Sequence, residues 1–429
     1  RFPRTAFHAA LLDLQARHPV LRSRLMADPA RDEFFLLEEA PGSAKVRVEW
    51  GRCQGENPFE AVWDREMRKP PAIGEVNTQL FVLEAEQDNG DWTSEVVFVM
   101  DHFFCDGLSV TNLLKELLVL TNAYREHEEN GGPAPDFEAI VGGPLAWNPP
   151  MEKAITKSFL HVATQWLSSL YFIVRHSVML PKSVDFPVAD YSITAKELPQ
   201  RCICHPITRE IDSSICKPLA QVCKAQKITI GCAISAAMTY AARDLVEERQ
   251  VSHDLLKNRV FSVAMAMDLR RRYAEPLTQE SLSYHISSMR MYYVPYEEAQ
   301  QDGPVTRETL LKRAHSTSEH TRAFAESGLN FGTVLQLFFE QPPTFDYLST
   351  LALTNWGRLN VPEKVGPYSV ETIFGMPNNP HFRMPTLVSS SLHGKMRLTM
   401  VVSEPACTRA TANAFLDHLI DNLKLMIAA

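Results

Sequence analysis

The chain has 429 residues, which is too long for one ordinary hydrophobic core, so two domains of about 200 residues each are expected. A hydrophobic content of 45% and an aromatic content of 9% are typical of a well-packed globular protein, and a net charge of −8 without a basic block argues against nucleic acid as a partner. The eight cysteines show no disulfide-framework spacing, and the opening RFPRTAF has no apolar signal-peptide core. These features predict a globular protein of a reducing, cytoplasmic compartment.

The first half of the chain alternates helical and strand patterns. Residues 4–16 carry apolar side chains on one helical face, and residues 33–38 and 78–85 are runs of strand length. Residues 95–100 form an apolar, β-branched run, which predicts a strand buried on both faces. Because the chain begins on a helix without the strand that would usually partner it, we expect a short N-terminal piece to be missing.

The pattern becomes helical soon after the strand 95–100. Ser109 suits the N-cap of this helix, and the apolar residues that follow recur on one stripe: Val110, Leu113, Leu114, Leu117 and Leu118. A tight turn lies between the strand and the helix. It contains His102, Asp106 and Gly107 in an H-x-x-x-D-G arrangement.

This turn is the candidate catalytic element. An imidazole titrates near neutral pH, so His102 can take a proton from a hydroxyl or an amine if the ring is held in one tautomer and one direction. Asp106 either orients the ring or pairs with an arginine and braces the turn, while Gly107 allows backbone angles or a close approach that a side chain would forbid. The alternative is a structural histidine at a strand end beside a helix-capping aspartate.

The middle of the chain separates the two halves. Residues 126–150 are rich in Gly, Pro and charge, which indicates a surface loop. Residues 159–180 are almost long and apolar enough to span a membrane, but they include side chains that are costly at the centre of a bilayer: His161, Gln165, Arg175 and His176. A helix packed on the domain is therefore favoured over peripheral membrane contact. Residues 181–199 are interpreted as a linker.

The second half repeats the alternation. Strands are predicted over 202–207, 259–268, 287–295, 348–354 and 395–403, and helices over 213–225, 230–248, 307–325 and 408–427. The pattern predicts an α/β protein with two layers in each half, in which helices cover largely mixed sheets. We expect an N-terminal subdomain over 1–180, the linker over 181–199 and a C-terminal subdomain over 200–429.

Five stretches of the sequence, taken in order, carry a family resemblance. They are LLDLQARHPVLRSRL (11–25), DHFFCDG (101–107), KITIGCAISAAMTYAARDL (227–245), AMAMDLRRRY (264–273) and LTNWGRLNVPEKVGP (353–367). These stretches resemble motifs of the CoA-dependent acyltransferase superfamily. Its members include chloramphenicol acetyltransferase, plant BAHD acyltransferases, peptide-synthetase condensation domains and the alcohol O-acyltransferases of polyketide and fungal secondary metabolism.

Two departures from the family patterns narrow the resemblance. Condensation domains usually carry a second histidine just before the catalytic one, and here that position is Asp101. The D-F-G-W-G segment of the plant BAHD enzymes is absent, and Thr354-Asn355-Trp356-Gly357 stands late in the chain. Both departures favour the stand-alone O-acyltransferases over peptide-bond formation.

The resemblance implies two chloramphenicol-acetyltransferase-like subdomains in a V shape around a central tunnel. It implies direct acyl transfer, in which His102 removes the proton of an acceptor hydroxyl, the oxygen attacks a thioester carbonyl and no acyl-enzyme forms. The acceptor would be a small-molecule alcohol. The co-substrate would be acyl-CoA or a phosphopantetheine-linked acyl group on an acyl carrier protein. We expect no permanently bound cofactor and no metal, and two halves in one chain favour a monomer.

Further site residues are candidates with open alternatives. Thr354 and Asn355 are candidate donors to the developing oxyanion and Trp356 is a candidate wall of the tunnel, unless this segment only shapes a turn. Arg270 is a candidate ion-pair partner of Asp106, against the alternative of a solvated arginine run.

Two cysteine-containing motifs are interpreted as structural. Cys105 lies inside the H-x-x-x-D-G turn and is expected to be a small turn residue rather than a nucleophile. The Cys202-Ile203-Cys204-His205 cluster alternates like a strand and lacks a second ligand pair, which favours strand residues over a zinc site.

Three functions are therefore considered. The leading one is an O-acyltransferase that acts on a hydroxyl of a small metabolite. The second is an N-acyltransferase or condensation-type amide former, against which Asp101 argues. The third is a catalytically silent scaffold of the same fold, against which the intact His102, Asp106 and Gly107 argue.

Overall fold

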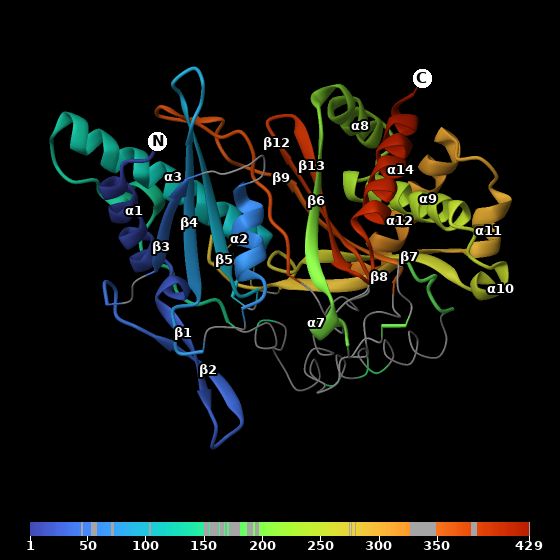
Figure 1. Cartoon of the computed structure of the whole chain (residues 1–429), viewed down its shortest axis with the longest axis horizontal. Coiled ribbons are helices and arrows are strands. Elements are labelled where there is room, and N and C mark those ends of the chain that lie inside the picture. Colours follow the sequence, from blue (N-terminus) through green and yellow to red (C-terminus); the bar gives the residue numbers. More distant parts are fainter. Residues whose placement is uncertain are drawn as a thin grey trace. The chain divides into compact units, whose positions relative to one another are not determined.

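The computed structural model describes residues 1–149, 181–326 and 349–428, together with residues 154, 163, 167 and 170. Short gaps in these ranges are 44–45, 53–57, 70–72, 103, 187–191, 194–196, 274, 276, 279 and 379–383. The chain divides into two compact units (Figure 1). Unit 1 comprises Arg1–Pro149, Leu277–Tyr284 and Val361–Glu371, and unit 2 comprises Pro150–Pro276, His285–Asn360 and Thr372–Ala429. The subdomain limits at 180 and 200 stay a prediction.

Unit 1 is built on a three-stranded sheet. Its elements are α1 (Arg4–Arg17), η1 (Pro19–Arg22), β1 (Ser23–Asp28), β2 (Glu33–Glu38), β3 (Arg47–Arg52), α2 (Pro58–Glu66), β4 (Thr78–Glu86), β5 (Trp92–Met100), α3 (Gly107–Asn130), α4 (Phe137–Val141), β10 (Lys364–Val365) and β11 (Tyr368–Ser369). The sheet order is β3-β4-β5, with a parallel β3–β4 pair and an antiparallel β4–β5 pair. Helices α1 and α3 pack on each other, and their apolar faces share one core with the sheet.

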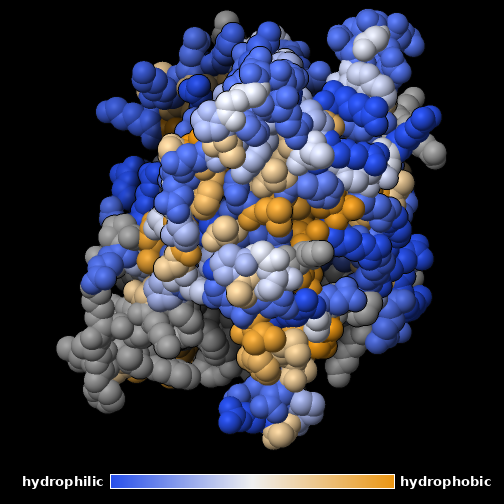
Figure 2. Space-filling view, turned by 90° about the vertical axis from the view of Figure 1, so that its left-hand side faces the viewer, coloured by the Kyte–Doolittle hydropathy of each residue, from blue (hydrophilic) through white to orange (hydrophobic). Residues whose placement is uncertain are grey.

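The hairpin formed by β1 and β2 leaves an apolar strand exposed. Every residue of β2 is exposed, including Phe34 at 66% and Leu36 at 36%, and β1–β2 forms a separate two-stranded sheet. This hairpin, labelled β1 and β2, is found at the bottom of Figure 1, and at the bottom of Figure 2 hydrophobic colours lie just above a polar tip. An exposed hydrophobic edge strand is a template for pairing with another chain.

We expect the double variant Phe34→Thr and Leu36→Thr to lower self-association when the protein is concentrated, because two apolar contacts are removed from an open edge. The thermal midpoint should change little, because the two side chains are exposed in the folded chain. Light scattering against protein concentration measures the effect. Leu12→Thr, which changes a residue of α1 that is 52% exposed, is the matched control. Unchanged scattering in the double variant would contradict the prediction.

Unit 2 is built on a six-stranded mixed sheet. Its elements are α7 (Leu198–Arg201), β6 (Ile203–Ile211), α8 (Ser213–Ala225), α9 (Ile230–Glu248), α10 (His253–Leu256), β7 (Val260–Asp268), β8 (Ile286–Pro295), α11 (Tyr296–Gln301), α12 (Arg307–Glu326), β9 (Leu351–Arg358), β12 (Thr386–Leu392), β13 (Lys395–Glu404) and α14 (Arg409–Ile427). The order is β6-β13-β12-β9-β7-β8, and β9 is parallel to both β12 and β7. Helix α9 packs against α12 and α14, and its small residues allow this close approach.

Most predicted elements are confirmed, with three differences. The strand 95–100 is not buried on both faces, because it lies in the edge strand β5, where Val96, Phe98 and Met100 pack against the core but are only partly buried. Residues 126–150 are not one loop, because α3 continues to Asn130 and α4 follows. Val184 and Phe186 of the predicted linker are buried in the core of unit 2. The apolar stretch 159–180 lies outside the described residues, except for Ala163, Leu167 and Leu170. Within the described part of the chain, no helix has both the length and the hydropathy to cross a membrane.

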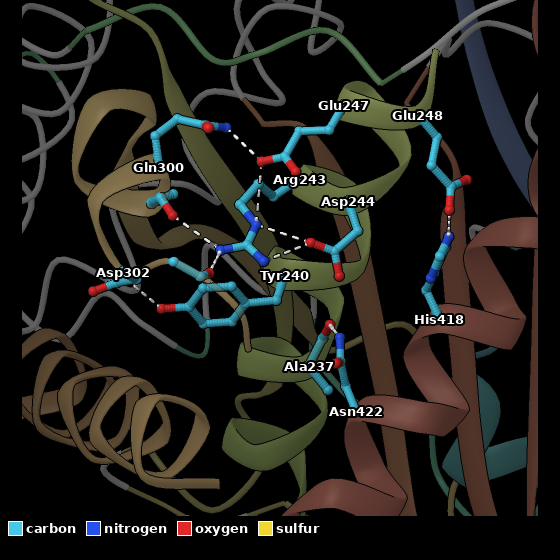
Figure 3. A network of polar contacts seen from close by, with 12 residues as sticks. Ala237, Tyr240, Arg243, Asp244, Glu247, Glu248, Gln300, Asp302, His418 and Asn422 are labelled. Atoms are coloured by element: carbon cyan, nitrogen blue, oxygen red, sulfur yellow. Dashed lines mark hydrogen bonds and ion pairs between the residues drawn. The ribbon is translucent and has the colours of Figure 1, made fainter. Parts of the chain in front are cut away.

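A polar network ties α9 to α11, as Figure 3 shows, and Arg313 extends this network to α12. The Arg243 guanidinium donates to the backbone oxygens of Ala299 and Gly303 at 3.0 and 2.8 Å, at the C-terminal end of α11, where carbonyls lack helical partners. The Tyr240 hydroxyl and the Arg313 Nη2 both donate to Asp302 Oδ2, at 2.6 and 2.7 Å. Asp302 therefore accepts two hydrogen bonds, one of them from a buried cation.

We expect Asp302→Asn to lower the free energy of unfolding by roughly 2 kcal/mol at neutral pH, because Arg313 keeps its charge but loses one of its two anionic partners. The partner that remains, Glu298, lies 2.7 Å from Arg313 but is 47% exposed, whereas Asp302 is 19% exposed. Burial alone would raise the pKa of Asp302, but the hydrogen bonds from Arg313 and Tyr240 outweigh it and lower the pKa. A lowered pKa in the folded state stabilises the protein above the unfolded pKa, and this stability is lost as the pH falls through the folded pKa. The difference between the two proteins should therefore shrink in acid.

Denaturant unfolding at several pH values measures this effect. Asp421→Asn, at a side chain that is 71% exposed and paired with Lys424, is the control and should cost little. A constant difference between wild type and Asp302→Asn from neutral pH into acid would contradict the role of the ionised carboxylate.

Candidate active site

The candidate turn is held by the first turn of α3. Asp106 is the N-cap, and its carboxylate accepts a hydrogen bond from the Ser109 amide at 3.1 Å. The Ser109 hydroxyl in turn accepts from the Asp106 amide at 3.0 Å, which completes a capping box. The prediction that Ser109 is the N-cap is therefore wrong. The N-cap is Asp106, three residues earlier, and Ser109 is the N3 residue that completes the capping box with it. Gly107 is the first helical residue.

His102 lies in the turn that follows β5, with an exposed side chain. Its Nδ1 lies 2.7 Å from the backbone oxygen of Cys105. A carbonyl oxygen can only accept a hydrogen bond, so Nδ1 must carry the proton in the neutral ring. The remaining nitrogen, Nε2, then has its lone pair available. A backbone carbonyl thus fixes the tautomer that a general base needs.

Cys105 is buried beside this histidine. Burial, together with the nearby charges of Asp106 and Asp101, raises the pKa of the Cys105 thiol to about 12. A thiol with this pKa is protonated at neutral pH, and the thiolate is the nucleophilic form. The side chain is only 6% exposed. This geometry supports the interpretation of Cys105 as a structural residue of the turn.

We expect Cys105→Ala to keep acyl transfer within about threefold of wild type, because the backbone oxygen that holds His102 is retained. We also expect the wild-type enzyme to resist inactivation by iodoacetamide at neutral pH. Initial rates before and after alkylation measure both effects. A loss as large as that of a nucleophile variant, several orders of magnitude, would contradict this role for Cys105.

Tyr284 is a neighbour of His102 that no sequence pattern indicated. The two rings lie at 5.2 Å between centroids with an interplanar angle of 84°, an edge-to-face contact. Burial raises the pKa of Tyr284, and the charge of Asp106 raises it further, so the phenol is neutral at physiological pH. The tyrosine comes from Leu277–Tyr284, which packs with unit 1 although its chain neighbours belong to unit 2.

The candidate oxyanion donors lie in β9 of unit 2. Asn355 Oδ1 accepts hydrogen bonds from the Gly357 amide at 2.9 Å and from the Ser389 hydroxyl at 3.1 Å. Because the oxygen is engaged in this way, the Asn355 side chain presents its NH₂ group away from these partners, towards Gly231. Thr354 precedes it in the same strand, with a half-buried side chain.

Trp356 occupies a bulge in the same strand. Ser389 pairs with Asn355 and Ser390 pairs with Gly357, so Trp356 is the extra residue. Its ring packs where a side chain at Gly375 would lie, because a Cβ there would come within 2.5 Å of Trp356 Cη2. A bulge of this kind re-aims one side chain without ending the strand.

Arg270 is buried, unlike the two arginines that follow it. Its exposed fraction is 0%, whereas Arg271 and Arg272 are exposed. The Arg270 Nη1 donates to Asp268 Oδ1 at 3.1 Å, at the end of β7. The alternative that Arg270 belongs to a solvent-exposed run of arginines is therefore wrong. Its pairing with Asp106 stays a prediction, because the two residues belong to different units.

The predicted site residues fall into two groups. His102, Asp106 and Gly107 share one turn of unit 1, whereas Arg270, Thr354, Asn355 and Trp356 belong to unit 2. Among the described residues, no group of three or more His, Cys, Asp or Glu side chains is arranged to hold a metal ion. Cys204 and His205 lie in β6, as the sequence predicted, whereas Cys202 precedes that strand and is the C-cap of α7.

The fold is similar to that of several solved structures. The trichothecene 15-O-acetyltransferase TRI3 from Fusarium sporotrichioides is 14% identical with a TM-score of 0.71, over 99% of this chain and 87% of that one. The condensation domain of the Monacolin K polyketide synthase MokA is 14% identical with a TM-score of 0.65, over 100% and 90%. The epimerization domain from the third module of tyrocidine synthetase B is 13% identical with a TM-score of 0.63, over 99% and 89%.

These similarities show the two-subdomain chloramphenicol-acetyltransferase-like fold, as the sequence predicted. The sequence matches the alcohol acetyltransferase family model over residues 75–294, which is more than half of the chain. A comparison with curated proteins finds no significant match. The chain belongs to the alcohol acetyltransferase family and is an acyltransferase.

Proposed function

We propose that this acyltransferase moves an acyl group from a thioester to a hydroxyl of a small metabolite, with His102 as the general base. The observation that carries the proposal is the hydrogen bond from His102 Nδ1 to the Cys105 backbone oxygen at 2.7 Å. It leaves Nε2 as the basic atom of an exposed imidazole. The alcohol acetyltransferase family and the fold shared with a trichothecene O-acetyltransferase support an alcohol as the acceptor.

The reaction proceeds by direct transfer. His102 Nε2 takes the proton of the acceptor hydroxyl as its oxygen forms a bond to the thioester carbonyl carbon. The tetrahedral intermediate then collapses, the carbon–sulfur bond breaks, and the proton on Nε2 passes to the leaving thiolate. The ester and the free thiol are the products, and no acyl-enzyme is required.

The residues of unit 2 have supporting roles in this proposal. Asn355 and Thr354 donate hydrogen bonds to the oxyanion, and Trp356 lines the acceptor site. The engaged Oδ1 of Asn355 supports this role, because it leaves the NH₂ group of that side chain as a donor. Arg270 pairs with Asp106 and holds the turn in place. Its complete burial supports an ion pair in addition to the one with Asp268.

The proposal also includes the acyl donor, the oligomeric state and the cellular compartment. The donor is acyl-CoA or an acyl group on the phosphopantetheine of a carrier protein, which the fold shared with condensation domains supports. The enzyme acts as a monomer in the cytoplasm. None of the seven cysteines among the described residues forms a disulfide, which fits a reducing compartment.

Release of free thiol from acetyl-CoA and from longer acyl-CoAs tests this proposal. A panel of alcohols and a matched panel of amines serve as acceptors, and wild type is compared with His102→Ala. We expect thiol release that requires an alcohol and is lost in the variant. Turnover that requires an amine would instead identify an amide former. Turnover only with acyl chains on a carrier protein would identify the donor, and no turnover with either donor would favour a silent scaffold.

A further inference from the structure

The contact between Tyr284 and His102 depends on a segment that is distant in the sequence. Leu277–Tyr284 docks on unit 1 through Leu282, which is 2% exposed and belongs to the core of that unit. Two polar contacts, at Glu280 and at Ser283, add to this docking. Arg17 Nη2 lies 2.8 Å from Glu280 Oε2, and Asn148 Nδ2 donates to Ser283 Oγ at 2.9 Å.

Arg17 gives this segment a rigid support. The side chain of Arg17 is 2% exposed and also donates to Glu116 Oε2 at 3.2 Å and to the Gly143 backbone oxygen at 2.5 Å. Glu116 lies on α3, the helix whose N-terminus carries the Asp106 cap. The segment with Tyr284 and the turn with His102 are therefore anchored to the same helix.

His102 needs such a support, because its side chain is exposed. One hydrogen bond, to the Cys105 oxygen, holds Nδ1 but leaves the ring able to swing about that contact. The Tyr284 ring packs edge-to-face on the His102 ring, at 5.2 Å between centroids, and restricts this motion. Small misplacements of a catalytic group cost large factors in rate.

We propose that Tyr284 is a positioning residue whose aromatic ring holds the His102 imidazole in the orientation that donates Nδ1–H to Cys105 and presents Nε2 to the acceptor. The inference rests on the proposed role of His102 as general base. The ring, and not the hydroxyl, carries the effect. Tyr284 contacts no reacting atom and acts through His102.

Three variants test the proposal by kinetics. Tyr284→Ala should lower kcat by roughly 10- to 100-fold, with the KM for the acyl donor changed less than about threefold. Tyr284→Phe keeps the ring and should restore at least about half of kcat. Ser283→Ala is the matched control, because it removes a docking contact of the same segment and keeps the ring. It should leave kcat within about twofold of wild type.

Nitrogen NMR of the imidazoles provides a readout that requires no turnover. The His102 signal is assigned by its loss in His102→Ala. In wild type and in Tyr284→Phe we expect the single tautomer protonated at Nδ1, and in Tyr284→Ala we expect exchange between both tautomers. If Leu277–Tyr284 had only a structural role, its alteration would not change the tautomer of the His102 ring alone.

Two results would overturn the proposal. In the first, Tyr284→Phe loses as much kcat as Tyr284→Ala, which would assign the effect to the hydroxyl. In the second, the His102 tautomer in Tyr284→Ala is the same as in wild type. Failure of the proposed function is distinguishable, because it would appear as no alcohol-dependent turnover in any protein, while the NMR comparison would still decide the role of Tyr284.

Discussion

His102→Ala should lower alcohol-dependent thiol release by about 10²- to 10⁴-fold, the contribution of a positioned general base. The free energy of unfolding should fall by less than about 1 kcal/mol, because the side chain is exposed and makes one hydrogen bond to a backbone oxygen. Initial rates and denaturant unfolding of the same preparation measure both quantities.

His8→Ala is the matched control for this variant. His8 is an exposed histidine of α1 in the same unit, and its removal should leave the rate unchanged. If His102→Ala retains full activity, His102 is not the base. If it unfolds the protein, the histidine has a structural role at the end of β5, which is the alternative that the sequence left open.

Asp106→Ala should lower both stability and activity. Loss of an N-cap costs about 1–2 kcal/mol, and the carboxylate of Asp106 is buried. The turn that holds the Cys105 oxygen ends at this cap, so the position of His102 changes with it. We expect transfer to fall by at least about tenfold. Thermal unfolding and initial rates provide the measurement.

Two further variants separate the cap from the charge of Asp106. Asn caps helices about as well as Asp, so Asp106→Asn should restore most of the stability if the cap is the main role. A loss in Asp106→Asn as large as in Asp106→Ala would instead support the pairing with Arg270. Asp136→Ala is the control, because it removes the N-cap of a different helix, α4. The Asp136 carboxylate accepts hydrogen bonds from the Glu138 and Ala139 amides, and its loss should leave activity unchanged.

The sequence predicted the strand and the helix around the candidate turn, because each of them depends on the pattern of neighbouring residues. The apolar run 95–100 lies within β5, and the helical stripe from Val110 lies on α3. The N-cap was misplaced because Asp106 and Ser109 both suit an N-cap by residue type, and the capping box uses both. Only the backbone geometry distinguishes the two positions.

Contacts between distant parts of the chain could not be predicted in this way. Tyr284 precedes the strand β8 in the sequence, and nothing in its neighbourhood indicates contact with a histidine in another part of the chain. The burial of Arg270 among three adjacent arginines depends on tertiary packing, which composition does not reveal. The bulge at Trp356 depends on its pairing with β12, which is a property of two strands and not of one.

The discontinuity of unit 1 has a consequence for how the protein is made. Leu282 fills part of its core, and the ring of Tyr368 packs on Phe2 at 4.8 Å between centroids. When residues 1–149 have been synthesised, unit 1 therefore still lacks two segments, Leu277–Tyr284 and Val361–Glu371. Unit 1 can complete its fold only after synthesis has passed residue 371. By then two of the three segments of unit 2, residues 150–276 and 285–360, have already been synthesised.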